Sequence, residues 1–145
     1  MLTIEKPPQY LDIIQHDNHF YEFVFKKGSR TTLDEWFIYM EQLFQLPPDT
    51  LVKMLIDSTQ YQPPLTYAFR HAKEMIKKYP NRPKPMRIVF MENENQNALH
   101  RILQSFVQLL TTGDSISYVY GNKRQQALDF LFEKEPHLHP SKSAQ

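Results

Sequence analysis

The stretch best suited to chemistry is Asp57-Ser58-Thr59, in which a carboxylate adjoins two hydroxyl groups. It closes a short, mostly apolar run, LVKMLID, that is typical of a buried strand, and ligands of open parallel sheets lie beyond the carboxyl ends of strands. Such a group could hold a metal, accept a phosphate or be phosphorylated. The same residue types also begin turns, because short polar side chains bond to the nearby backbone. We favour this second interpretation.

Two catalytic interpretations of this stretch have little support. A receiver-like phosphoprotein with Asp57 as phosphoacceptor needs more acids at the end of an early strand, where this chain has Phe25-Lys26-Lys27. A hydrolase centred on Ser58 lacks the GxSxG elbow. The six histidines show no spacing typical of metal ligands, and the absence of cysteine excludes disulfides, thiolate zinc sites and cysteine nucleophiles. We therefore expect no catalytic residue, no metal and no cofactor.

Composition narrows the function classes further. The chain has 145 residues with 41% hydrophobic residues, and its net charge of +1 argues against a nucleic-acid binder that uses its whole surface. The three glycines stand alone, so no phosphate-cradling loop is present. No apolar run approaches the roughly 20 residues of a transmembrane helix, and the first nine residues contain no signal-peptide core. We expect a cytoplasmic protein.

Hydrophobic periodicity predicts alternating strands and helices. Residues 10–15 and 20–26 form a hairpin, and Thr32 with Glu35 forms a capping box at the start of a helix that Pro47-Pro48 ends. Further strands are expected at 51–57, 86–91 and 116–120, and further helices at 65–79, 93–110 and 122–132, the last capped by Asn122. The order β-β-α-β-α-β-α-β-α predicts an α/β fold: a mostly parallel sheet with one antiparallel edge strand and helices packed on it. We expect one domain over residues 8–133 and a disordered tail over 134–145.

One surface is expected to be strongly basic. Between Arg70 and Arg87 the chain carries seven basic residues and a single acid, Glu74. These cations could contact an acidic protein, phosphate groups or an anionic lipid surface, or they could merely complement the dipole of the second helix. The expected anionic-partner surface consists of Lys73, Lys77, Lys78, Arg82 and Lys84.

In the order and spacing of these elements, from Tyr10 to Phe132, the chain resembles the STAS family, named for sulfate transporters and anti-sigma-factor antagonists, and within it proteins like the sporulation anti-anti-sigma factor. Members that act as phosphoswitches carry a motif like Asp-Ser-Ser/Thr-Gly where the second helix begins. Here the matching stretch is about Gln62-Pro63-Pro64-Leu65, with neither hydroxyl nor glycine, and Thr66 is the nearest hydroxyl after it. The resemblance implies the fold and a non-enzymatic signalling or regulatory role.

A protein partner is therefore expected at the loop after the third strand and at the start of the second helix. The residues expected to bind it are Ser58, Thr59, Tyr61, Thr66 and Tyr67. The alternative is a domain that binds a small ligand or an anionic lipid in an apolar pocket between sheet and helices, with basic residues at its mouth. A homodimer also stays open, because an exposed sheet edge can pair with a second copy.

Overall fold

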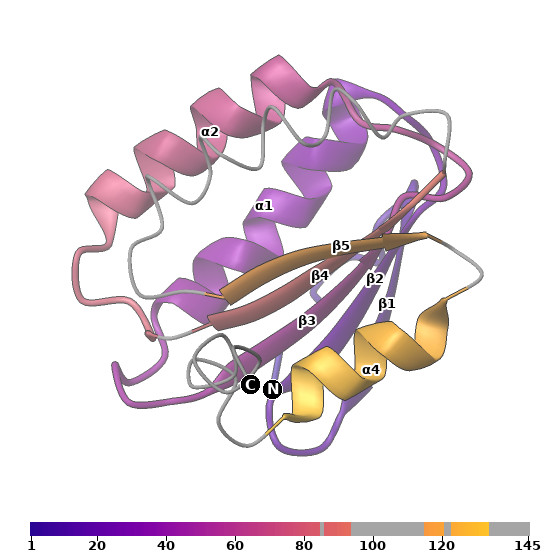
Figure 1. The fold of residues 1–145 in the computed structure, drawn as a ribbon. Helices are drawn as coiled ribbons and strands as arrows, with labels where there is room; N and C mark the ends of the chain where they lie inside the picture. Colours follow the sequence, from indigo (N-terminus) through magenta and orange to yellow (C-terminus); the bar gives the residue numbers. More distant parts are fainter. Residues whose placement is uncertain (85, 94–114, 121–122, 134–145) are drawn as a thin grey trace.

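The computed structural model describes residues 1–84, 86–93, 115–120 and 123–133 (Figure 1). Its elements follow the predicted order, apart from the helix expected at 93–110, nearly all of which lies outside the described residues, as does the tail at 134–145. They are β1 (Leu11–His16), β2 (Phe20–Phe25), α1 (Arg30–Phe44), β3 (Val52–Asp57), α2 (Leu65–Lys78), β4 (Met86–Glu92), β5 (Ser115–Tyr120) and α4 (Arg124–Phe132).

The strands form one five-stranded sheet in the order β1-β2-β3-β4-β5. β1 pairs with β2 antiparallel, with Leu11 opposite Phe25, and β2, β3, β4 and β5 are mutually parallel. The hairpin turns through Asn18 and His19, whose φ angles are 59° and 56°; asparagine and histidine tolerate this left-handed region better than most residues. The predicted mixed sheet with one antiparallel edge strand is confirmed.

Helix α1 begins three residues earlier than the sequence suggested. Its N-cap is Ser29, whose hydroxyl accepts the Thr32 backbone N–H at 3.3 Å, so the capping box expected from Thr32 and Glu35 is wrong. Thr32 is instead fully buried. The Glu35 carboxylate accepts the backbone N–H groups of Gln9 and Tyr10, which anchors the chain ahead of β1. The Asn122 cap is also wrong, because Lys123 is the N-cap of α4.

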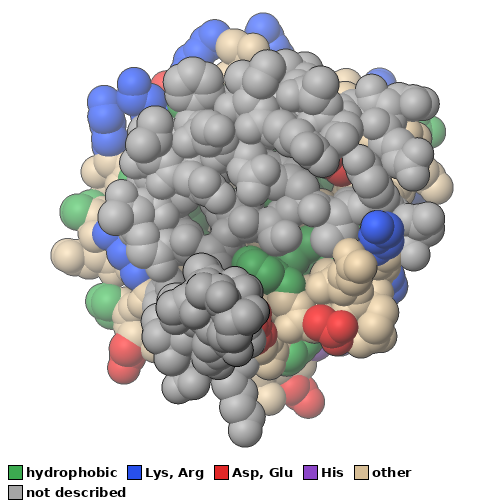
Figure 2. All heavy atoms as spheres, in the orientation of Figure 1, with side chains coloured by type: hydrophobic (Ala, Val, Ile, Leu, Met, Phe, Trp, Pro, Cys, Tyr) green, Lys and Arg blue, Asp and Glu red, His purple; other side chains and the backbone are tan. Residues whose placement is uncertain are grey.

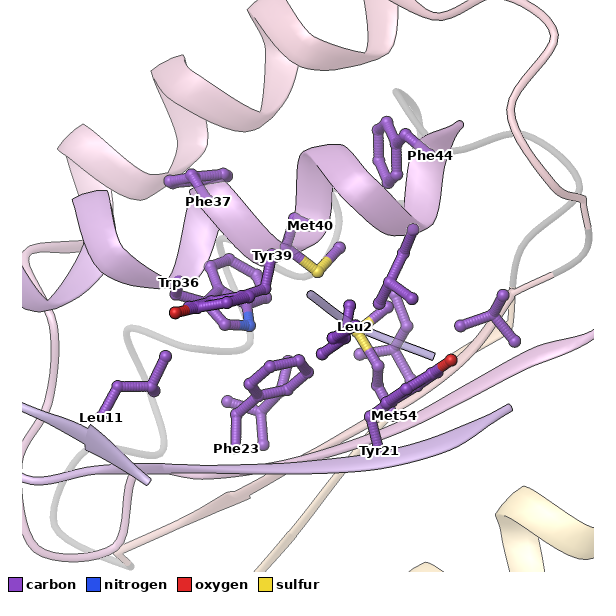
Figure 3. Close-up of a cluster of buried hydrophobic side chains, with 14 of the residues drawn as sticks. Leu2, Leu11, Tyr21, Phe23, Trp36, Phe37, Tyr39, Met40, Phe44 and Met54 are labelled. Carbon is purple, nitrogen blue, oxygen red and sulfur yellow. The ribbon is translucent and has the colours of Figure 1, made fainter. Parts of the chain in front are cut away.

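The helices cover both faces of the sheet. Helices α1 and α2 lie on one face and α4 on the other (Figure 1). The larger core lies under α1, where Phe23, Trp36 and Met54 meet (Figure 3). Leu2 belongs to this core, so residues ahead of position 8 also pack on the domain. A smaller core under α4 joins Leu55 and Val89 to Ala127 and Leu131.

Candidate functional site

The loops that follow β2 and β3 touch at the carboxyl edge of the sheet, where both α1 and α2 begin. Gly28 lies so close to the other loop that a Cβ on it would stand 2.5 Å from the backbone oxygen of Gln62. The contact holds the two helix starts side by side. This is the edge at which ligands of parallel sheets usually bind.

The side chains of Asp57, Ser58 and Thr59 form hydrogen bonds within the protein. The Asp57 carboxylate accepts both the backbone N–H and the hydroxyl of Thr59, at 3.0 and 2.6 Å. Ser58 is only 2% exposed, and its N–H and hydroxyl both donate to the Met91 carbonyl of β4. The prediction that Ser58 contacts a partner is therefore wrong, because the strand pairing turns it inward. Thr59 is half-buried.

The other three predicted partner residues reach the surface. Tyr61 is 43% exposed, and Thr66 is exposed in the first turn of α2. Tyr67 is half-buried, and its hydroxyl donates to the Asp34 carboxylate of α1 at 2.5 Å. This hydrogen bond is the main reason why the pKa of Tyr67 is raised. Tyr67 thus joins the first turn of α2 to Asp34, which lies just after the first turn of α1.

Cations lie against two tyrosine rings at this edge, those of Tyr67 and Tyr10. The Arg30 guanidinium lies 5.0 Å from the Tyr67 ring centre, and Lys27 Nζ lies 4.7 Å from that of Tyr10. Arg70, exposed on α2, also acts on Tyr67, because its positive charge partly offsets the rise in the pKa of that hydroxyl. Neither α1 nor α2 has an acid in its first turn, and no side chain caps α2 at Pro64. Positive charge therefore gathers at this edge without a carboxylate in either first turn.

The basic surface expected along α2 is only partly present. Lys73, Lys77 and Lys84 are exposed, and Figure 2 shows Lys and Arg side chains at the upper left, where α2 lies in Figure 1. Arg82 is only 3% exposed; its guanidinium lies 5.3 Å from the Phe44 ring centre and donates to the Pro83 carbonyl. Its assignment to an anionic-partner surface is wrong, because the arginine packs against the end of α1.

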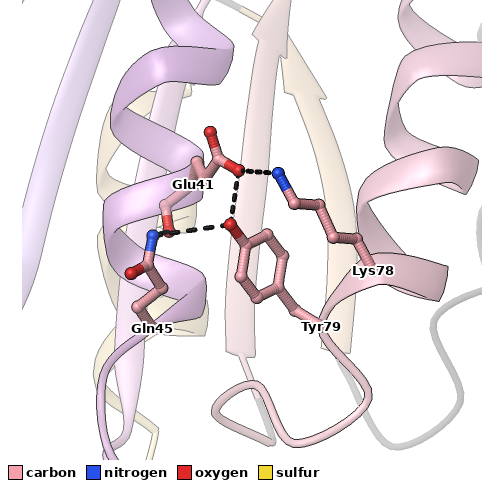
Figure 4. A network of polar contacts seen from close by, with 4 residues as sticks. All are labelled: Glu41, Gln45, Lys78 and Tyr79. Carbon is pink, nitrogen blue, oxygen red and sulfur yellow. Dashed lines mark hydrogen bonds and ion pairs between the residues drawn. The ribbon is translucent and has the colours of Figure 1, made fainter.

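Lys78 also differs from a free surface cation. Its Nζ lies 2.7 Å from the Glu41 carboxylate of α1 (Figure 4). The same carboxylate accepts a hydrogen bond from the Tyr79 hydroxyl, and the Gln45 side chain donates to Tyr79. The hydrogen bond from Lys78, followed by that from Tyr79, lowers the pKa of Glu41. The same bonds raise the pKa of Lys78 and of Tyr79. The network fastens the last turn of α2 to α1.

A buried polar cluster on the α4 face was not foreseen. Glu22 of β2 is 6% exposed, and its carboxylate lies 2.6 Å from His16 Nε2 and accepts Arg124 of α4 at 2.8 Å. Arg87 of β4 donates to the Leu131 carbonyl in the last turn of α4 at 3.0 Å. The sequence held one indication of this cluster. Phe20 and Val24 flank Glu22 on the same face of the strand, which indicates that this second face of the sheet is also buried. The cluster ties α4 to the sheet.

His71 of α2 is partly buried between α1 and α2. Its ring lies 4.5 Å from that of Phe37 and 5.2 Å from that of Tyr67. Among the described residues, no group of histidines and acids is arranged to hold a metal ion. No helix within the described part of the chain is long and apolar enough to cross a membrane. His100, His137 and His139 lie outside the described residues.

Comparisons with known proteins identify the fold and no more. No family model and no curated protein matches the sequence. The structure is similar to a crystal structure from Shewanella loihica PV-4, an uncharacterised protein of the DUF3478 family with a SpoIIAA-like fold. The two share 17% sequence identity at a TM-score of 0.53, over 83% of this chain and 91% of the other. The predicted resemblance is confirmed at the level of architecture: the chain has a SpoIIAA-like fold of the STAS type.

Proposed function

We propose that this chain is a non-catalytic regulatory module that binds an acidic segment of another protein at the carboxyl edge of its sheet. The surface concerned, here called the edge surface, comprises Lys27, Arg30, Tyr61, Thr66, Tyr67 and Arg70. The observation that carries the proposal is the packing of Lys27 and Arg30 on tyrosine rings at the point where both helices begin.

The charges at this edge favour an anionic partner. Backbone N–H groups at a helix start carry partial positive charge, and anions near them are stabilised by about 0.3–1 kcal/mol each. Here two such starts lie together and neither first turn holds an acid to satisfy them. Arg30 and Arg70 add full charges. An acidic peptide would meet complementary potential at Lys27, Arg30 and Arg70.

The aromatic residues supply the rest of an interface. Tyrosine and arginine are the residue types most often found at the energetic centre of protein contacts, because each offers a large rigid group with a polar end. Tyr61 is 43% exposed on a loop whose base is fixed by the buried Ser58 and by the contact at Gly28. A fixed base lowers the entropy cost of ordering that loop on binding. The SpoIIAA-like fold is consistent with this role, although a fold does not assign one.

The test is photocrosslinking followed by affinity measurement. A benzoylphenylalanine placed at Tyr61, in cells that normally make the protein, should crosslink to a partner segment rich in Asp and Glu. With the purified partner, the Arg30→Glu/Arg70→Glu variant should bind at least tenfold more weakly, and the loss should shrink as salt rises. Lys84→Glu, with the charge change at a distant exposed lysine, should bind like the wild type. Equal affinity of the wild type and the double variant would reject the proposal.

A further inference from the structure

A second surface of the molecule has the opposite charge. Between α1 and α2 lies an open groove of about 340 Å³. Its floor is formed by Phe37, His71 and Met75, and Ile38 of α1 stands on its rim. The volume falls at the small end of the range for ligand sites, about 300–1,000 Å³.

The groove presents apolar side-chain area that a partner could bury. Phe37 and Met75 are each 7% exposed, and Ile38 is 57% exposed, one of the few large apolar side chains so open among the described residues. Burial of apolar area yields about 25 cal/mol per Å². A partner side chain seated on this floor would remove part of Ile38 and of both floor residues from water.

The charged residues of the groove are mostly acidic. Three carboxylates, Asp34, Glu41 and Glu74, line it together with a single ammonium, that of Lys78. Counting −3 and +1, the net charge is −2 with His71 neutral. Lys78 is already bonded to Glu41, whereas Glu74 is exposed and forms no ion pair with any residue that the structure describes. The lining of the groove therefore favours a cation over an anion.

His71 adds a polar group without a partner. Its Nδ1 is buried and accepts or donates no hydrogen bond within the described part of the chain. Leaving a buried polar atom unpaired costs about 1–3 kcal/mol. A bound group that pairs with it would recover this energy.

We propose that the groove between α1 and α2 binds a short basic segment of a partner protein. An apolar side chain of that segment lies on Phe37 and Met75 beside Ile38, and a lysine or arginine next to it reaches Glu74 and Asp34. A helix that lays one apolar stripe into a groove, with cations along its border, has this combination of features. The groove and the edge surface differ in charge, so they select segments of opposite charge.

The test uses a display library of random dodecapeptides selected on the full-length protein. Peptides enriched on the wild type should combine Lys or Arg with Leu, Ile, Met or Phe. Each should lose at least tenfold in affinity on the Ile38→Asn/Glu74→Lys variant, whose two side chains are exposed and make no bond needed for folding. The matched control is Ile14→Asn/Asp49→Lys, which changes an exposed isoleucine and an exposed acid outside the groove, and it should bind like the wild type.

The outcomes are distinct from those of the edge surface. Affinity for these peptides should not fall in Arg30→Glu/Arg70→Glu, because both changes add negative charge beside the groove, so that failure of one proposal leaves the other standing. Absence of enrichment, enrichment of acidic peptides, or equal binding to the groove variant would overturn the inference. Light scattering supplies a further check: a wild-type dimer that Ile38→Asn/Glu74→Lys converts to monomer would assign the groove to a second copy and overturn it too.

Discussion

The Gly28→Ala substitution probes the contact on which the edge surface depends. A methyl group at Gly28 would stand 2.5 Å from the Gln62 oxygen and 3.3 Å from the carbon of the same carbonyl. Non-bonded heavy atoms rest at about 3.5–4.0 Å, so the two loops must separate by about 1 Å. Both close atoms belong to the backbone, and no rotamer change of Gln62 can relieve the clash.

Two contributions of opposite sign set the change in the free energy of unfolding that Gly28→Ala should cause. Overpacking of this kind costs about 1–3 kcal/mol. Gly28 does not adopt a left-handed φ, so alanine fits its backbone and gains about 0.4–1 kcal/mol by restricting the unfolded chain. The net expectation is a loss of about 1–2 kcal/mol, which for a chain of this length lowers Tm by about 2–8 °C.

The assay is urea unfolding followed by tryptophan fluorescence, since the single Trp36 is 8% exposed and reports the main core. Lys73→Ala, a change at an exposed position of α2 away from both loops, is the control and should alter stability by less than about 0.5 kcal/mol. Backbone amide shifts of Tyr61 and Thr66 should move in Gly28→Ala and stay in the control. A Gly28→Ala protein as stable as the wild type would refute rigid contact between the loops.

Two further predictions concern bonds between distant segments. Arg87→Met removes the donor to the Leu131 carbonyl and should lower the free energy of unfolding by about 1–3 kcal/mol, because a buried acceptor loses its partner. Amide hydrogen exchange should become faster in α4 more than in α1. Unchanged exchange in α4 would contradict the bond. Glu41 has a lowered pKa, caused first by Lys78 and then by Tyr79, so its stabilisation is present above the unfolded pKa of about 4.3 and is lost as pH falls through the folded value. The stability difference between the wild type and Glu41→Gln should stay below about 1 kcal/mol at neutral pH, because the pair is partly exposed, and should shrink as the pH falls below about 4.3. A difference independent of pH would count against the network.

Periodicity was sufficient for the elements and their order. In α1, apolar residues recur at helical spacing at Trp36, Met40 and Leu43, and all three are buried. Residues 20–26 alternate so that Phe23 and Phe25 share one face of the strand, and both lie in the main core. These predictions hold because a period of 3.6 or 2 residues is a property of the local backbone. The family resemblance followed from the same order of elements, without a single signature residue.

The candidate site was only partly accessible to such reasoning. The carboxyl edge and the exposed Tyr61 and Thr66 could be predicted, because strand ends are readable from sequence. The sequence did not show that Lys27 and Arg30 belong to the edge surface. Their positions on the rings of Tyr10 and Tyr67 depend on how distant segments of the chain pack together. The groove was missed for the same reason, as its acids come from two helices.

For the part of the chain that the structure describes, the sequence by itself determined the strands, the helices and their order, because these depend on neighbours within a few positions. It did not determine which polar residues are buried. Ser58 faces a carbonyl 33 residues away, and Glu41 is held by Tyr79, 38 residues away. Arg82 packs on Phe44 of another helix. Only the tertiary structure decided these positions. A polar side chain is buried where a distant segment supplies its hydrogen-bond partner, and the local spacing of residues does not indicate which segment that is.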